Sequence, residues 1–103
     1  MNKAYKVIVD PAANDKMGDH LEFLARVGGA AAERLLNQLV ADMRSLEFMA
    51  HRNPMHNGPY LKNGKYRYMM SSDRYRIVYQ IEDDMVFVED IQDCRQSDDD
   101  NFA

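Results

Sequence analysis

The chain has 103 residues, of which 46% are hydrophobic and 29% are charged. These values suit one small globular domain and exclude a disordered chain, and the formal net charge of −4 argues against a nucleic-acid binder. No apolar run approaches the roughly 20 residues that cross a membrane, and the N-terminus lacks the apolar core of a signal peptide, so we expect a cytoplasmic protein. Cys94 is the one cysteine and lacks clustered histidines, so we expect no disulfide, metal or cofactor.

The N-terminal half predicts one strand and two helices. Residues 4–9 are rich in β-branched side chains and stop at Asp10, which can cap a helix, and Pro11, which suits its first position. Apolar residues at helical spacing continue to Gly28-Gly29, and a second amphipathic helix is expected over residues 30–49. The two-glycine link indicates an antiparallel helical hairpin. The apolar stripe of the second helix consists of Leu35, Leu36, Leu39, Val40, Met43 and Leu46.

The C-terminal half predicts a loop and then three strands. Residues 51–64 contain Asn-Pro and Asn-Gly pairs, which are typical of turns. The three strand-like segments that follow are separated by short polar breaks of hairpin length. The expected order is β-α-α-β-β-β, an α+β fold in which the helical hairpin packs on one face of a mainly antiparallel twisted sheet. The expected strands are 65–71, 74–82 and 85–92, with breaks at Ser72-Asp73 and Asp83-Asp84.

We expect residues 1–103 to form a single domain, with a flexible acidic tail over about 97–103. Three consecutive aspartates in this tail repel one another. Charge is also unevenly distributed along the chain, because the charged residues within 51–79 are mostly basic and those within 82–100 are mostly acidic.

Strand parity predicts a basic face. A two-residue turn at Ser72-Asp73 pairs Met69 with Arg76 and gathers alternate residues on each face of the hairpin. Cations on one face could hold phosphates, although the solvated side of a one-sided sheet gives the same pattern. The cations of this expected basic face are Lys65, Arg67, Arg74 and Arg76. The expected apolar face consists of Tyr66, Tyr68, Met70, Tyr75, Ile77 and Tyr79.

The last hairpin leaves its register open. A two-residue turn at Asp83-Asp84 places Val86 and Val88 with the core, whereas a longer turn places Met85 and Phe87 there. Both alternatives remain at this point.

The run KYRYMMSSDRYRIVYQIEDDMVFVEDIQDCR, residues 65–95, resembles the C-terminal half of the RelE/ParE superfamily of toxins from type II toxin-antitoxin, or plasmid stabilisation, systems. The resemblance implies a RelE-like two-layer fold, growth inhibition, and a cognate antitoxin that forms a hetero-oligomer with the toxin. In the RelE branch the target is mRNA on the ribosome, cleaved without a metal. In the ParE branch the target is DNA gyrase, inhibited by binding.

The resemblance also assigns roles to particular residues. Arg67 takes the first of two lysine positions of the RelE-type cleaving strand, whereas Met69 takes the second and loses the charge. Arg76 matches the arginine that holds the scissile phosphate, and Arg95 matches the arginine that stabilises charge in the transition state. The segment after Arg95 lacks the tyrosine or histidine that RelE-like enzymes use next.

RNA cleavage also needs proton carriers, which arginine does not supply. His51 and His56, in the loop before the basic strand, are the candidates because histidine titrates near neutrality, although the turn-rich context favours ordinary exposed loop positions for both. The main expectation is therefore a toxin that cleaves mRNA on the ribosome. The alternatives are a non-catalytic inhibitor of DNA gyrase and a degenerate member without toxicity.

Overall fold

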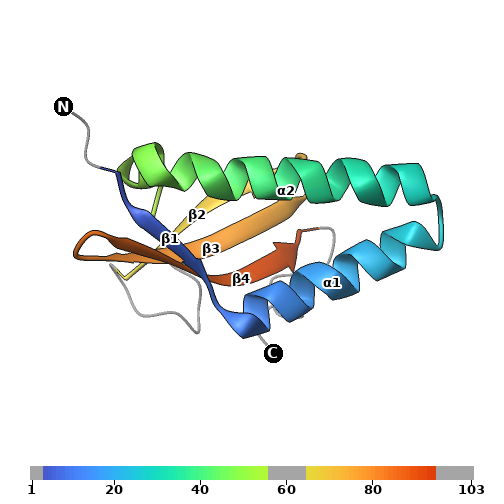
Figure 1. Cartoon of the computed structure of the whole chain (residues 1–103), viewed down its shortest axis with the longest axis horizontal. Helices are drawn as coiled ribbons and strands as arrows, with labels where there is room; N and C mark the ends of the chain where they lie inside the picture. Colours follow the sequence, from blue (N-terminus) through green and yellow to red (C-terminus); the bar gives the residue numbers. More distant parts are fainter. Residues whose placement is uncertain (1–3, 56–64, 95–103) are drawn as a thin grey trace.

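The computed structural model describes residues 4–55 and 65–94 and confirms the predicted order of elements (Figure 1). A helical hairpin lies against one face of a four-stranded sheet. Every predicted strand and helix is present, with ends shifted by a few residues at most. The elements are β1 (Lys6–Val9), α1 (Pro11–Ala25), α2 (Gly29–Met49), the short 3-10 helix η1 (Ala50–Arg52), β2 (Tyr66–Ser71), β3 (Tyr75–Glu82) and β4 (Met85–Asp93).

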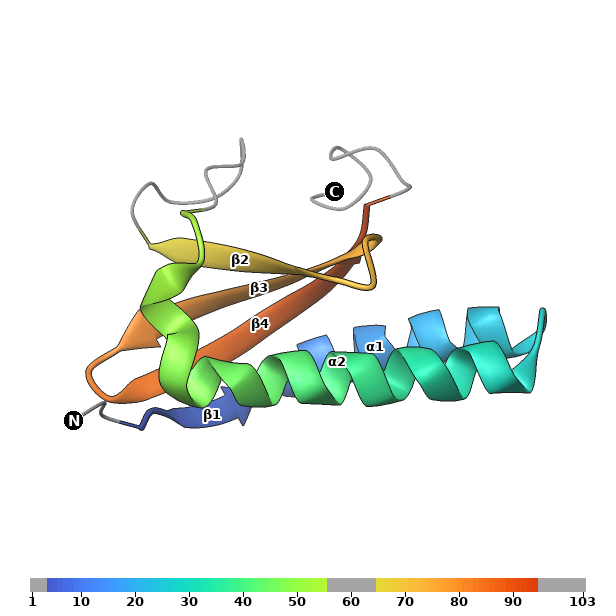
Figure 2. The same ribbon diagram turned by 90° about the horizontal axis from the view of Figure 1, so that it is seen from above.

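The sheet has the strand order β1-β4-β3-β2. β2 pairs with β3 and β3 with β4 in antiparallel fashion, and β1 lies parallel to β4. A parallel neighbour requires a long crossover connection, which the helices help to provide. Figure 2 shows both helices on the same side of the sheet, so no helix of the described residues covers the opposite face, which is called the open face below. Within the described residues, no helix is long and apolar enough to cross a membrane.

The predicted start of α1 is confirmed. The Asp10 carboxylate accepts a hydrogen bond from the Ala12 N–H at 2.8 Å, and Pro11 occupies the first turn. At the other end of α1, the Gly28 N–H donates to the Leu24 carbonyl at 3.0 Å. The chain then reverses into α2, which gives the antiparallel hairpin that the two glycines predict.

The core lies between α2, α1 and the sheet. Leu35, Leu39, Met43 and Leu46 of α2 are buried, whereas Leu36 and Val40 are each 37% exposed. The buried stripe of α2 is therefore narrower than the sequence predicted, because only one row of its apolar residues faces the sheet. The strands contribute Tyr75, Ile77, Tyr79, Val86, Val88 and Ile91 to the same core.

The register of the first hairpin corrects the predicted basic face. Arg74 donates its N–H to the Ser71 carbonyl at 3.3 Å, yet the strand pairing resumes between Ser71 and Tyr75, so the turn holds three residues. Met69 consequently pairs with Ile77, and Met70 pairs with Arg76. A shift of one residue turns every side chain of a strand to the other face. The faces predicted for β3 therefore hold, but those predicted for β2 are reversed.

The second hairpin has one of the two registers that the sequence left open. Glu82 pairs with Met85 across a two-residue turn, and Val86 and Val88 are fully buried. The register of this ladder shifts once, between Val78 and Tyr79.

Candidate functional site

Arg67 lies on the face of the sheet that carries the helices, next to the end of α2. Its Nη1 donates to the Asn53 carbonyl at 2.7 Å and to the His51 carbonyl at 3.4 Å. The segment around Pro54 also pairs with the outer edge of β2, because the Tyr68 N–H donates to the Pro54 carbonyl at 3.1 Å. Arg67 therefore fastens the segment after α2 to the sheet.

Tyr79 holds the same segment from the neighbouring strand. Its hydroxyl donates to the Ala50 carbonyl at 2.6 Å and accepts from the Asn53 side-chain amide at 3.0 Å. Burial raises the pKa of the Tyr79 phenol above its ordinary 10.0, while the hydrogen bond from Asn53 and the charge of Arg67 act in the opposite direction. A buried phenol with two partners is typical of a structural anchor.

Arg76 lies on the open face, opposite to Arg67. Its Nη1 donates to the Gln92 side-chain carbonyl at 3.1 Å, and its guanidinium lies 5.5 Å from the centre of the Tyr68 ring. Gln92 in turn donates to Asp90 at 3.1 Å, and Asp90 forms an ion pair with Lys16 of α1 at 3.0 Å. Arg76 thus belongs to a polar network that runs across β4.

Arg74 is bound within the fold. Its Nε and Nη2 donate to the two carboxylate oxygens of Asp93 at 3.0 and 2.7 Å, and its guanidinium lies 5.0 Å from the centre of the Tyr75 ring. Both side chains of the pair are largely buried. The sequence pattern does not reveal Asp93 as the partner of Arg74, and the only local signal for it is an acidic residue just after the last predicted strand.

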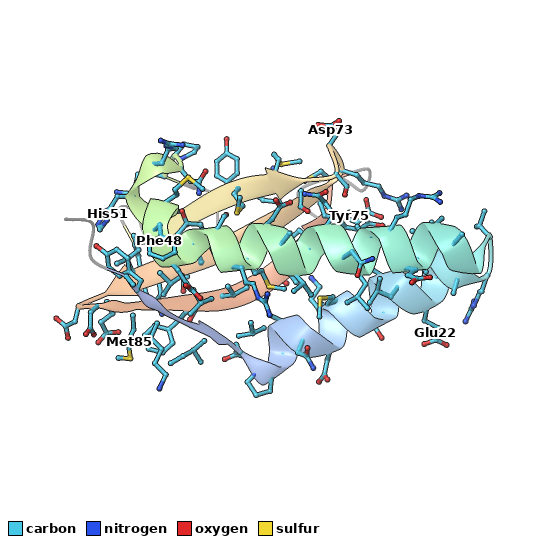
Figure 3. The ribbon with its side chains drawn as sticks, turned by 45° about the horizontal axis from the view of Figure 1, so that its top comes forward. Glu22, Phe48, His51, Asp73, Tyr75 and Met85 are labelled. Atoms are coloured by element: carbon cyan, nitrogen blue, oxygen red, sulfur yellow. The ribbon has the colours of Figure 1, made fainter. Side chains whose placement is uncertain are left out.

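The predicted proton carrier His51 lies at the end of α2 (Figure 3), and its side chain is exposed. Its Nδ1 shares a hydrogen bond of 3.1 Å with the Tyr5 hydroxyl. A polar hollow of about 330 Å³ brings His51 together with Lys65 and Arg67, and Asp83 also lines it. The structure therefore groups three of the predicted site residues.

The other predicted residues are not grouped with these three. Arg76 is on the opposite face and Arg74 is paired with Asp93, while His56, Arg95 and the tail over 97–103 lie outside the described residues. In the part of the chain that the structure describes, no group of three histidine, cysteine, aspartate or glutamate side chains could hold a metal ion.

The family model for the ParE toxin of the type II toxin-antitoxin system parDE matches residues 7–97. The chain belongs to this ParE toxin family. The fold agrees, since a solved structure described as the chromosomal ParDE TA system from P. aeruginosa superimposes with a TM-score of 0.72. At 9% sequence identity, the match covers 88% of this chain and 97% of that one. No curated protein matches the sequence.

The surface of this ParE-family toxin carries large apolar side chains on its helices. Phe23 is 53% exposed and Val27 is 79% exposed near the tip of the hairpin, and Phe48 is 58% exposed at the other end of α2. Apolar groups of this size on a surface are typical of protein-protein contacts when they gather in patches.

Proposed function

We propose that this toxin acts by binding DNA gyrase and inhibiting it, with no chemical step of its own. The observation that supports the proposal most is the position of Arg67 and Arg76 on opposite faces of the sheet. The RelE-type mechanism needs its cations around one phosphate, because charge develops there in the transition state. Two guanidiniums separated by the sheet do not meet this requirement.

The charges around Arg76 also favour binding over RNA cleavage. Glu89 accepts a hydrogen bond from Gln80 at 2.8 Å, and Asp90 is paired with Lys16. These two carboxylates lie on the same strand as Gln92, the partner of Arg76. Carboxylates beside the arginine that would hold the RNA phosphate would repel the RNA, whereas a protein partner tolerates mixed charges.

The deciding experiment measures DNA supercoiling by gyrase in the presence of the purified chain. We expect inhibition that rises with toxin concentration and that Arg76→Ala leaves unchanged. In parallel, mRNA 5′ ends are mapped after induced expression, and we expect them to match those of uninduced cells. Intact supercoiling together with new 5′ ends on translated messages would contradict the proposal.

A second candidate function, mRNA cleavage on the ribosome, is supported by the polar hollow at the end of α2. His51 could carry a proton there, and Lys65 and Arg67 could balance the charge of a phosphate. The variant His51→Gln separates the two functions. It would abolish cleavage if this hollow were catalytic, and it would leave gyrase inhibition intact.

We further propose that a cognate antitoxin binds and neutralises this toxin in a hetero-oligomer, as membership of a toxin-antitoxin family implies. A small gene next to the toxin gene is expected to encode it. Co-expression of the two is expected to restore growth and to give a complex that survives purification. Growth arrest that persists in the presence of the neighbouring gene product would contradict the pairing.

A further inference from the structure

A hollow of about 320 Å³ lies between the helical hairpin and the turn that joins β2 to β3. In Figure 2 the tip of the hairpin extends past the end of the sheet, beyond the turn between β2 and β3. Leu24 of α1 lines the hollow together with Ala31 and Leu35 of α2, which gives it an apolar floor. Arg34, Arg74 and Tyr75 are among its polar lining residues.

Tyr75 brings an unused hydrogen-bond donor to this place. The residue is only 2% exposed, and its hydroxyl has no hydrogen-bond partner of ordinary geometry in the described part of the chain. The Oγ of Ser71, which pairs with Tyr75 in the sheet, is buried without a partner as well. Buried hydroxyls are nearly always satisfied in folded proteins, because leaving them unpaired destabilises the fold.

Two cations line the hollow, Arg34 and Arg74, and only Arg74 is engaged in an ion pair that the described residues show. Arg34 is exposed and makes no ion pair within residues 4–55 and 65–94. Arg74 is held in place by Asp93, so its guanidinium is fixed beside the ring of Tyr75. Burial raises the pKa of the Tyr75 phenol, while the charge of Arg74 lowers it and the charge of Asp93 raises it. Gln38, also at the hollow, donates to Asp42 at 3.0 Å.

We propose that this hollow binds a glutamate side chain of a protein partner. Arginine pairs with a carboxylate through charge-assisted hydrogen bonds, and the Tyr75 hydroxyl can donate one more to the same group. The apolar floor suits the methylene groups of the glutamate and an aliphatic neighbour, which an inorganic phosphate lacks. The proposal concerns a surface other than the polar hollow beside His51, and it does not depend on the identity of the toxin's target.

The first test uses a defined probe, the peptide acetyl-Leu-Glu-Glu-Leu-amide, with acetyl-Leu-Gln-Gln-Leu-amide as its neutral control. The probe is titrated into the isotope-labelled chain while backbone amide shifts are followed by NMR. We expect the acidic peptide to shift Arg34 and Tyr75 and the neutral peptide to bind about tenfold more weakly or not at all. Arg34→Glu is expected to abolish binding. Arg52→Glu makes the same charge change at the far end of α2 and is expected to have no effect.

The second test uses Tyr75→Phe, which removes only the hydroxyl. An unpaired buried hydroxyl destabilises the free protein, so the variant is expected to have a higher thermal midpoint than the wild type. The same hydroxyl would donate to the bound carboxylate, so the variant is expected to bind the acidic peptide about tenfold more weakly. A purely structural role for Tyr75 would not give these opposite effects.

Three outcomes would overturn the proposal. One is equal binding of the acidic and neutral peptides. The second is a set of amide shifts, on addition of the acidic peptide, that leaves Arg34 and Tyr75 unaffected. The third is an affinity for the acidic peptide that Tyr75→Phe does not change. A chain shortened after Arg95 serves as a further control, because peptide binding that appears only after residues 96–103 are removed would assign the hollow to the chain's own acidic segment instead.

Discussion

The two turns of the C-terminal sheet have similar sequences but different lengths. The turn between β2 and β3 includes Arg74 as a third residue, whereas the turn at Asp83-Asp84 has two. In the first, the Arg74 carbonyl accepts the Cys94 N–H at 2.8 Å and the guanidinium binds Asp93, so β4 fixes the position of Arg74. Contacts from a distant strand therefore decide the length of one turn, while the other follows its local sequence.

One extra residue has a large effect because side chains alternate along a strand. It moves Arg67 to the helix side, where the guanidinium binds backbone carbonyls, and it leaves Arg76 on the open face. The two turns thus determine which side chains of the sheet could meet a partner. Four predictions test this comparison, in order of expected effect.

The largest effect is expected from Met69→Asp. Met69 packs against the core, so a carboxylate there should lower the free energy of unfolding by about 3–4 kcal/mol. Met70 is 42% exposed on the other face, and Met70→Asp should change the free energy of unfolding by less than about 0.5 kcal/mol. Urea denaturation of both variants gives the comparison. The reverse order of stability would indicate a two-residue turn between β2 and β3.

The next effect is expected from Asp93→Asn, which leaves the largely buried guanidinium of Arg74 without its charged partner. The free energy of unfolding should fall by about 2–3 kcal/mol, because the charge-assisted hydrogen bonds to Asp93 are weakened while the asparagine keeps one acceptor. Asp73→Asn is the matched control, since this exposed turn residue has a φ of 56° that asparagine also tolerates. Equal loss in both variants would show that Asp93 does not hold the turn.

Tyr79→Phe tests whether the alternate residues of β3 that include Tyr79 face the helices. Loss of the hydrogen bond to the Ala50 carbonyl should lower the free energy of unfolding by about 1–2 kcal/mol at neutral pH. Because burial raises the pKa of Tyr79 in the folded state, the unfolded chain loses this proton first, and wild-type stability should fall as the pH rises above about 10. Urea denaturation between pH 7 and pH 11 measures this slope. An equally steep alkaline loss in the variant would exclude Tyr79 as a source.

The smallest effect is expected from glycine in the turns. Ser72 has a φ of 54°, a left-handed conformation that disfavours side chains, so Ser72→Gly should raise the free energy of unfolding by about 0.5–1 kcal/mol. Asp84 lacks a positive φ, so Asp84→Gly should lower the free energy of unfolding by about 0.5–1 kcal/mol. Thermal unfolding of the two variants shows whether each substitution raises or lowers the stability. Both turns contain a left-handed residue, since Asp83 has a φ of 56°, and Asp84 is the position outside that region. A gain in both variants would mean that the backbone angle does not set the sign of the effect.

Much of the fold followed from the sequence because its signals are local. Asp10 and Pro11 mark the start of α1, and the apolar spacing marks both helices. The candidate site was less predictable. Arg67 and Arg76 were predicted to share one face of the sheet, but they lie on opposite faces because of a register that no local pattern reveals.

The sequence by itself determined the order of elements and the buried face of β3, which rest on short-range periodicity and turn chemistry, and the run over residues 65–95 carried the family resemblance. Only the tertiary structure decided what those residues contact. The pair Arg74–Asp93 and the bond from Arg67 to the Asn53 carbonyl join positions far apart in the chain. Such contacts depend on how the strands align, and a single added residue in a turn is enough to change that alignment.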